Sequence, residues 1–338
     1  MTNQTQNQSK NQMTNHKIIQ KPLPYLLKKE VIYKVLKCPK ETIIPTNDIE
    51  LWKKCPQYHW VYNKINICKA HNISCGPMGI SPQNDDYPVI LKPIINLLGM
   101  GMGISIASNA DEYNKLIKPG FFWMPFVKGH HLSCDFILVE GNIKWYCCFE
   151  GYPTIKGMFD YWETLPEWQP EDELIKWIRK KFNSYTGCLN IEIIGKIIIE
   201  CHMRMGDINH LHSIELMQNI INIYQGKEWK LQNYQIPKIY LVPIFIGNYF
   251  PIRLSGTEIF KICRNMDPKG EFIYTYQIDP STNKNNPPGG KRIANLNVNC
   301  LEIGLKVRKE VLNQINKIKY RYFMTLLALF IILFKIII

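Results

Sequence analysis

Two glutamates near the middle of the chain have the spacing of a metal-binding β-hairpin. Two isoleucine-rich runs meet at Gly195, and a three-residue loop there predicts that Ile194 pairs with Ile198. Glu192 then lies directly opposite Glu200, where like charges destabilise a sheet unless a cation lies between them. Mg²⁺ and Mn²⁺ prefer oxygen ligands and commonly bind carboxylates together with substrate phosphates. The pair therefore predicts a site for a divalent cation.

The same face of this hairpin collects further polar side chains. Because successive side chains alternate across a strand, Asn190, His202 and Arg204 join the two glutamates on it. The isoleucines between them point the other way, into a core. This pattern fits a covered site, and the alternative is a surface hairpin whose glutamates lie in water.

A second motif has the composition of a phosphate-binding loop. Gly99, Gly101 and Gly103 follow the strand-like run 87–94, and backbone N–H groups at such positions can turn toward phosphate oxygens. No Gly-Lys-Ser/Thr follows, which excludes a Walker loop, and the run 104–107 predicts a strand rather than the helix of a dinucleotide fingerprint. A simple glycine hairpin turn is the alternative.

The elements that position these motifs belong to a chain of several segments. Residues 1–20 are a polar leader predicted to be disordered, 21–57 form a short N-terminal region, and 58–320 form the main domain. One helix is predicted over 63–72 and another begins at Pro170, with acids in its first turn and basic residues in its last. The predicted apolar face of that second helix consists of Leu174, Trp177, Ile178 and Phe182.

The C-terminal run Tyr322–Ile338 has the composition of a membrane anchor. It is apolar except for Thr325 and Lys335, and a basic stretch that ends at Arg321 precedes it. A hydrophobic helix of this kind predicts a tail anchor that holds the protein on the cytosolic side of a membrane. A buried C-terminal helix is the alternative.

The overall composition is that of a globular protein with anionic partners. The chain has 338 residues, 46% hydrophobic and 20% charged, which excludes a disordered or collagenous protein. Its net charge of +13 favours phosphates, nucleic acid or a membrane surface. The basic residues are scattered, so we expect nucleotide or lipid binding and no specific nucleic-acid partner. The eleven cysteines form no C-x-x-C pair, which favours reduced thiols in the cytosol.

Taken in order, these motifs resemble those of the ATP-grasp superfamily. The similar segments, in chain order, are Asn63-Lys64, Tyr87–Pro93, the glycine loop, Trp123–Asp135, Tyr185–Arg204 and Gly289–Arg292. The resemblance implies an α+β fold in which two lobes with antiparallel sheets clasp ATP, here followed by the C-terminal hydrophobic helix. It also implies a ligase that uses ATP and Mg²⁺, or Mn²⁺, to activate a carboxylate as an acyl phosphate for attack by an amine or thiol.

The resemblance further implies a role for each site residue. The residues expected to bind ATP are Lys64, Lys92, Gly99, Gly101, Gly103, Phe126, Val127 and His131. The expected metal ligands are Glu192, Glu200 and His202, and the expected catalytic residues are Arg204 and Lys92. Of these two, Arg204 would stabilise the transferred phosphoryl group or the acyl phosphate.

Three positions depart from the family pattern. His202 stands where the family usually has an asparagine ligand, and its softer nitrogen shifts the expected preference toward Mn²⁺. Met124-Pro125 and His131 stand where acidic residues usually contact the nucleotide. These departures motivate an alternative function, in which a membrane-anchored scaffold or regulator binds nucleotide without catalysis. The partners implied by the first function are ATP and an unidentified carboxylate and amine pair.

Overall fold

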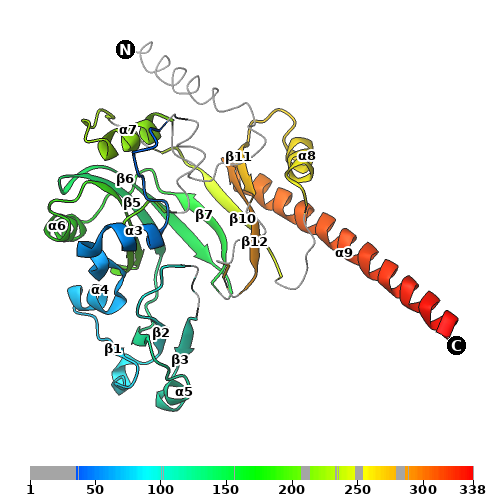
Figure 1. The fold of residues 1–338 in the computed structure, drawn as a ribbon, viewed down its shortest axis with the longest axis horizontal. Coiled ribbons are helices and arrows are strands. Elements are labelled where there is room, and N and C mark those ends of the chain that lie inside the picture. The colour runs from blue at the N-terminus through cyan, green and yellow to red at the C-terminus, as the bar shows by residue number, and fades with distance from the viewer. Residues whose placement is uncertain are drawn as a thin grey trace, which may run out of the picture. The chain divides into compact units, whose positions relative to one another are not determined.

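In the computed structural model of the protein, the chain divides into two compact units. The described residues are 36, 38–99, 101, 103–155, 157–206, 214–232, 234, 236–247, 254–278, 286–287 and 289–337, so the predicted leader lies outside them. The larger unit comprises residues 27–238 and 283–289, and the smaller unit comprises 1–26, 239–282 and 290–338. Figure 1 shows the course of the chain through the elements of both units.

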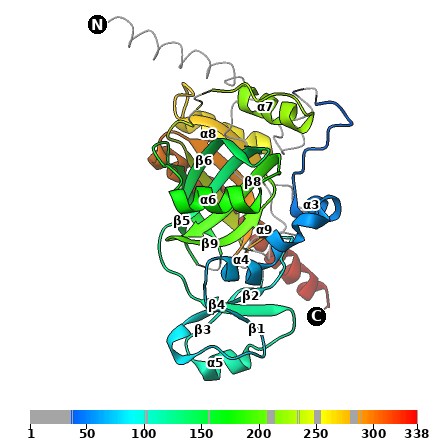
Figure 2. The same cartoon turned by 90° about the vertical axis from the view of Figure 1, so that its left-hand side faces the viewer.

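A four-stranded antiparallel sheet forms one part of the larger unit. Its strands, in spatial order, are β1 (Gly76–Pro77), β4 (Phe121–Pro125), β2 (Val89–Pro93) and β3 (Ser105–Ala107). The short helix α5 (Ala110–Lys115) lies beside β3 (Figure 2) and buries Tyr113 against Val89 and Leu91. The glycine loop connects β2 to β3, and the 3₁₀ helix η3 (Asn84–Asp86) precedes β2. The strands predicted on both sides of the loop are thus confirmed.

Five antiparallel strands form the second sheet of the larger unit. Their spatial order is β7 (Phe159–Thr164), β6 (Asn142–Pro153), β5 (His131–Val139), β8 (Gly187–Ile194) and β9 (Ile197–His202). The core under these strands contains Phe136, Leu189 and Ile191, all fully buried. This sheet presents the glutamates identified in the sequence.

Helix α6 (Asp172–Lys181) packs on this core as its sequence predicts. Asp172 and Glu173 occupy its first turn and three basic residues its last, which matches the helix dipole. Ile178 and Phe182 are fully buried, and Leu174 and Trp177 pack against the same cluster.

The residues before the first sheet pack on the second sheet. They form α3 (Asp48–Lys54), the 3₁₀ helix η2 (Pro56–Tyr62) and α4 (Lys64–Ala70). Helix α7 (Ile214–Tyr224), which comes later in the chain, also packs on this sheet, where it contacts β8. Asn47 caps α3, and the Asn63 side chain caps α4 by accepting from the backbone N–H groups of Ile65 and Asn66. Leu51 of α3 and Ile67 of α4 are buried in the core that also contains side chains of β8 and β9.

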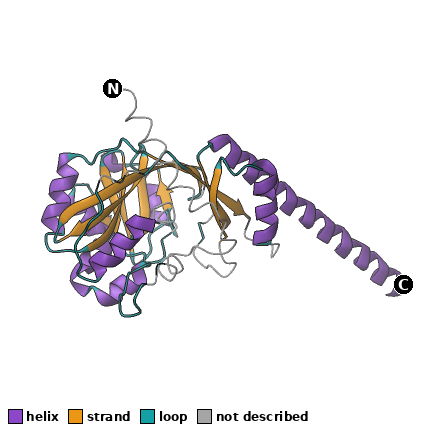
Figure 3. Ribbon diagram, turned by 90° about the horizontal axis from the view of Figure 1, so that it is seen from above, coloured by secondary structure: helices purple, strands orange, loops and turns teal. Residues whose placement is uncertain are grey.

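The described part of the smaller unit contains three strands and two helices. Its strands are β11 (Ile273–Ile278), β12 (Lys291–Val298) and β10 (Tyr240–Ile246), and its helices are α8 (Gly256–Met266) and α9 (Leu301–Ile337). Both helices lie next to these strands (Figure 3), and α9 contacts β10, β12 and α8. A side chain at Gly304 would come within 2.9 Å of Val242 and Val298, so glycine lets α9 approach the strands closely.

The C-terminal run does not support a membrane anchor. It is the end of the long helix α9, and no helix in the described part of the chain is long and apolar enough to cross a membrane. A span needs about 20 consecutive apolar residues, whereas Arg321 precedes this run and Thr325 and Lys335 interrupt it. The predicted membrane partner and transmembrane helix therefore find no support.

Candidate functional site

The β8–β9 hairpin places Glu192 directly opposite Glu200, as predicted. The predicted loop is wrong, because Ile194 pairs with Ile197 across a tighter turn. Gly195, with φ of +61°, occupies the first turn position, where two-residue hairpin turns favour glycine. A register shift after Glu192 leaves Ile199 as an extra residue in β9, which restores the predicted pairing of the glutamates.

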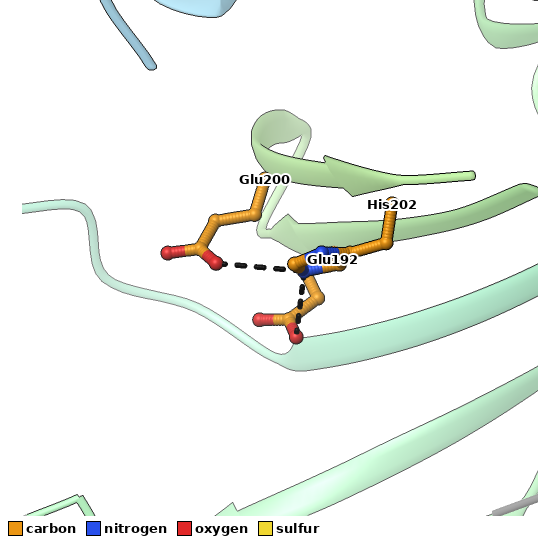
Figure 4. Close-up of side chains that lie close together, drawn as sticks. All are labelled: Glu192, Glu200 and His202. Carbon is orange, nitrogen blue, oxygen red and sulfur yellow. Dashed lines mark ion pairs between the residues drawn. The ribbon is translucent and has the colours of Figure 1, made fainter. Parts of the chain in front are cut away.

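Three candidate ligands converge on one point at the surface of this hairpin. Oxygens of Glu192 and Glu200 and a ring nitrogen of His202 all lie within 4.8 Å of one another. The Nε2 atom of His202 lies 3.5 Å from Oε2 of Glu200 and 3.9 Å from Oε1 of Glu192, as the dashed lines in Figure 4 show. Two carboxylates and an imidazole are a donor set that fits a divalent cation.

Two lysines from other elements accompany the glutamates. Lys64, the first residue of α4, places its Nζ atom 3.2 Å from Oε1 of Glu200. Lys92, on β2, is only 5% exposed. Burial lowers the pKa of Lys92, and the charge of Lys64 lowers it further, while Glu200 and Glu192 oppose the shift. The structure thus brings Lys64 into contact with one predicted metal ligand and Lys92 within electrostatic range of both glutamates.

Asp48 is a further site residue, which the sequence did not reveal. It is 2% exposed, and its Oδ2 atom accepts from Nδ1 of His202 at 3.1 Å and from Nε of Arg204 at 3.1 Å. The Nη2 atom of Arg204 is also 2.9 Å from this oxygen. Although burial alone would raise the pKa of Asp48, its two cationic neighbours hold that pKa well below its usual range.

The charges around His202 control its protonation. Burial alone would lower the pKa of His202, but the carboxylates of Asp48 and Glu200 raise it to about 9. The cations around Glu200, Lys64 foremost, overcome the effect of burial and hold the pKa of that carboxyl well below its usual value. A metal ion at Nε2 would therefore have to displace a proton at neutral pH.

His131 also lies beside the carboxylate pair. Its Nε2 atom is 3.3 Å from Oε2 of Glu192, and its ring meets those of Phe159 and Trp162 edge-on. The structure therefore places it next to the candidate metal ligands, and its expected contact with a ribose stays a prediction.

Phe126 and Val127 lie in the segment that joins the two sheets of the larger unit. The backbone N–H of Phe126 donates to the carbonyl of Pro88 at 2.8 Å, and Val127 packs beside Met124. Their role in holding adenine stays a prediction.

The three loop glycines adopt the left-handed conformation that favours glycine. The φ angles of Gly99, Gly101 and Gly103 are +68°, +62° and +77°. The Asn96 side chain stabilises the loop by accepting from the N–H groups of Leu98 and Gly99. The loop is the connection of a β-hairpin, and its role as a lid over phosphates stays a prediction.

A buried polar network holds the strands that carry the site. Asn190, on β8, donates to Ser133 at 2.9 Å and to Asp135 at 2.8 Å, both on β5. Asp135 also accepts from the backbone N–H of Gly206 at 2.7 Å, which fixes the chain just beyond Arg204. Buried hydrogen bonds between neighbouring strands favour one arrangement of those strands.

Comparisons with known proteins reveal similarity in structure only. No protein-family model and no curated protein matches the sequence. N5-carboxyaminoimidazole ribonucleotide synthetase from Thermotoga maritima matches with a TM-score of 0.52 and 13% identity over 78% of this chain and 76% of its own. An L-amino acid ligase from Bacillus licheniformis matches with a TM-score of 0.51 and 11% identity over 83% and 75%.

A third structure with this similarity contains a nucleotide. It is the N5-carboxyaminoimidazole synthase from Aspergillus clavatus in complex with ADP and 5-aminoimidazole ribonucleotide, with a TM-score of 0.54 and 11% identity over 79% of this chain and 78% of that one. The chain has the ATP-grasp fold. The predicted α+β architecture with antiparallel sheets is confirmed. Within this fold, Glu192, Glu200 and His202 lie on β8 and β9, and Lys64 lies at the start of α4.

Proposed function

We propose that this ATP-grasp chain is an ATP-dependent ligase that joins a carboxylate to an amine or thiol with the help of Mg²⁺ or Mn²⁺. The main supporting observation is that three candidate metal ligands meet on one hairpin, with Lys64 in contact with one of them and the charge of Lys92 within electrostatic range. Phosphoryl transfer requires positioned cations around the phosphates more than it requires a protein nucleophile. This cluster supplies such cations within a fold shared with enzymes whose structures contain ATP or ADP.

In the proposed reaction, the lysines and the candidate metal ligands have separate roles. Lys64 and Lys92 hold the phosphates of ATP, while Glu192, Glu200 and His202 hold the metal ion, which neutralises phosphate charge when bound. A carboxylate oxygen of the substrate attacks the γ-phosphorus, which yields an acyl phosphate and ADP.

The second step joins the two substrates. The amine or thiol attacks the acyl carbon and releases inorganic phosphate. In this step and the first, the positive charge that Arg204 carries beside the hairpin stabilises the phosphoryl group.

A second candidate function is nucleotide binding without catalysis. It is favoured by the cations that already neutralise the carboxylates, namely Lys64 at 3.2 Å from Glu200 and His202 with its pKa near 9. In that case the chain would act as a scaffold or regulator whose state depends on bound nucleotide.

The formation of ADP separates the two functions. The full chain is incubated with ATP, Mg²⁺ or Mn²⁺, and pools of carboxylic acids and amines, and ADP is measured. The ligase predicts ADP formation that requires both substrates and is lost in Glu200→Gln. Glu171→Gln is the matched control, because Glu171 is exposed and contacts Lys196 on the surface. Metal-dependent ATP binding without ADP from any pool would contradict the ligase and support the second function.

A further inference from the structure

The contact between Asp48 and His202 determines which ring nitrogen faces the glutamates. Oδ2 of Asp48 lies 3.1 Å from Nδ1, and Nε2 points to Glu192 and Glu200. A carboxylate can only accept at Nδ1, so the N–H of the ring belongs on the Asp48 side. Once the proton on Nε2 is displaced, the lone pair of the ring lies on this atom, among the other two candidate ligands.

Asp48 is held firmly enough to impose this orientation. It is the first residue of α3, after the cap residue Asn47, and Leu51 one turn later is buried in the core with β8 and β9. Arg204 contacts the same carboxylate oxygen through Nε at 3.1 Å and through Nη2 at 2.9 Å. These contacts leave the carboxylate little freedom to turn away from the imidazole.

We propose that Asp48 is a positioning residue that orients His202 as a nitrogen ligand and thereby gives the site a preference for Mn²⁺ over Mg²⁺. The inference rests on the proposed metal site. Metal-bound histidines usually donate their second N–H to a carboxylate or carbonyl, and loss of that partner typically weakens metal binding about 10- to 100-fold. A nitrogen ligand favours a transition metal, because Mg²⁺ strongly prefers oxygen ligands.

The test uses Mn²⁺ as the probe on the full chain without nucleotide. Electron paramagnetic resonance measures the concentration of free Mn²⁺, which gives the affinity. The bound Mn²⁺ is then examined for electron spin echo modulation from a coordinated ¹⁴N nucleus. We expect the unmodified chain to bind Mn²⁺ more tightly than Mg²⁺ and to show the ¹⁴N signal. In Asp48→Asn we expect about 10- to 100-fold weaker binding of Mn²⁺ and a reduced ¹⁴N signal.

Two controls separate positioning from a general loss of structure. Asp172→Asn changes an exposed aspartate at the corresponding place in α6 and should leave Mn²⁺ binding unchanged. In His202→Asn the ¹⁴N signal should vanish, and adding Asp48→Asn to that variant should weaken Mn²⁺ binding no further, because the group that Asp48 positions is gone.

The outcomes distinguish this inference from the proposed function. Bound Mn²⁺ with the same affinity and ¹⁴N signal in Asp48→Asn would overturn the positioning role alone. The positioning role would also be overturned if Asp48→Asn weakened Mn²⁺ binding by the same factor in the unmodified chain and in His202→Asn. In that case the loss of affinity would not depend on the imidazole. If the unmodified chain bound no Mn²⁺, the inference and the proposed metal site would both fail.

Discussion

At the residue scale, the candidate site is a chain of alternating charges. The order of contacts is Arg204, Asp48, His202, Glu200 and Lys64. Removing one member of such a buried chain leaves its neighbours with an uncompensated charge, which costs more than the contact itself contributes. Substitutions here therefore need readouts other than activity alone.

Lys92 offers a substitution whose effects on stability and binding should have opposite directions. In Lys92→Met, the free energy of unfolding should stay the same or rise, because the cost of burying the ammonium group outweighs its attraction to Glu200 and Glu192, and methionine fills similar space. Binding of ATP should weaken about tenfold to a hundredfold, as expected for a lost hydrogen bond to a charged group. Denaturant unfolding and calorimetric titration with ATP measure the two effects.

Lys196→Met is the matched control for that substitution. Its side chain is 82% exposed at the hairpin turn, so both quantities should stay unchanged. Unweakened ATP binding by Lys92→Met would remove Lys92 from the site.

Residue patterns revealed only those site residues that are close in sequence or belong to a recognisable motif. Glu192 and Glu200 could be paired because strand alternation and a short turn fix their relation within a few residues. Asp48 could not be predicted in this way, because 154 positions of the chain separate it from His202, which it contacts. The only local signal, an acid after Asn47, is typical of any helix start.

At the element scale, several predicted helices and strands are confirmed because local signals and tertiary packing agree. The helix at 63–72 appears as α4 with its asparagine cap, and α6 buries the predicted apolar face. The predicted hairpin loop between β8 and β9 is wrong by one residue, because a bulge absorbs the difference. Bulges depend on neighbouring strands, so sequence periodicity does not reveal them.

The end of α4 supplies a prediction about pH. Burial lowers the pKa of His71, which lies beside Trp177, and its Nε2 atom has no hydrogen-bond partner among the described residues. The folded state therefore binds a proton less readily than the unfolded state, where a histidine titrates near about 6.5. Stability that is present above that pH should be lost as the pH falls toward the pKa of the folded state.

The variant His71→Gln isolates this contribution. Between pH 7.5 and pH 5, the unmodified chain should lose more free energy of unfolding than His71→Gln, as measured from denaturant midpoints at both values. An equal loss in the two proteins would show that the protonation of His71 does not differ between the folded and unfolded states.

At the scale of the whole molecule, the order of motifs predicted the fold better than the hydropathy of the last segment predicted its environment. Motif order depends on many positions, and the structural similarity over 77% to 84% of the chain agrees with it. The tail prediction rested on one apolar run, which the structure shows as the end of the long helix α9.

The exposed residues of α9 just beyond Arg321 give a prediction about truncation. Tyr322, Phe323 and Leu329 are 54%, 61% and 51% exposed, so they bury little apolar surface. A chain that ends at Arg321 should keep its thermal midpoint within about 2 °C, since changes at exposed positions usually alter stability by less than about 0.5 kcal/mol. A fall of many degrees would show that this segment packs against other parts of the protein.

An ATP site on the β8–β9 hairpin is tested by the thermal midpoint of the full chain with ATP, with and without Mg²⁺ or Mn²⁺. Binding to the folded state must raise the midpoint, and ATP at about 100 times its Kd adds about 2.7 kcal/mol. We expect a metal-dependent rise that Glu171→Gln retains and Glu200→Gln loses. No rise with ATP under any metal condition, or an equal rise in Glu200→Gln, would contradict an ATP site built on this hairpin.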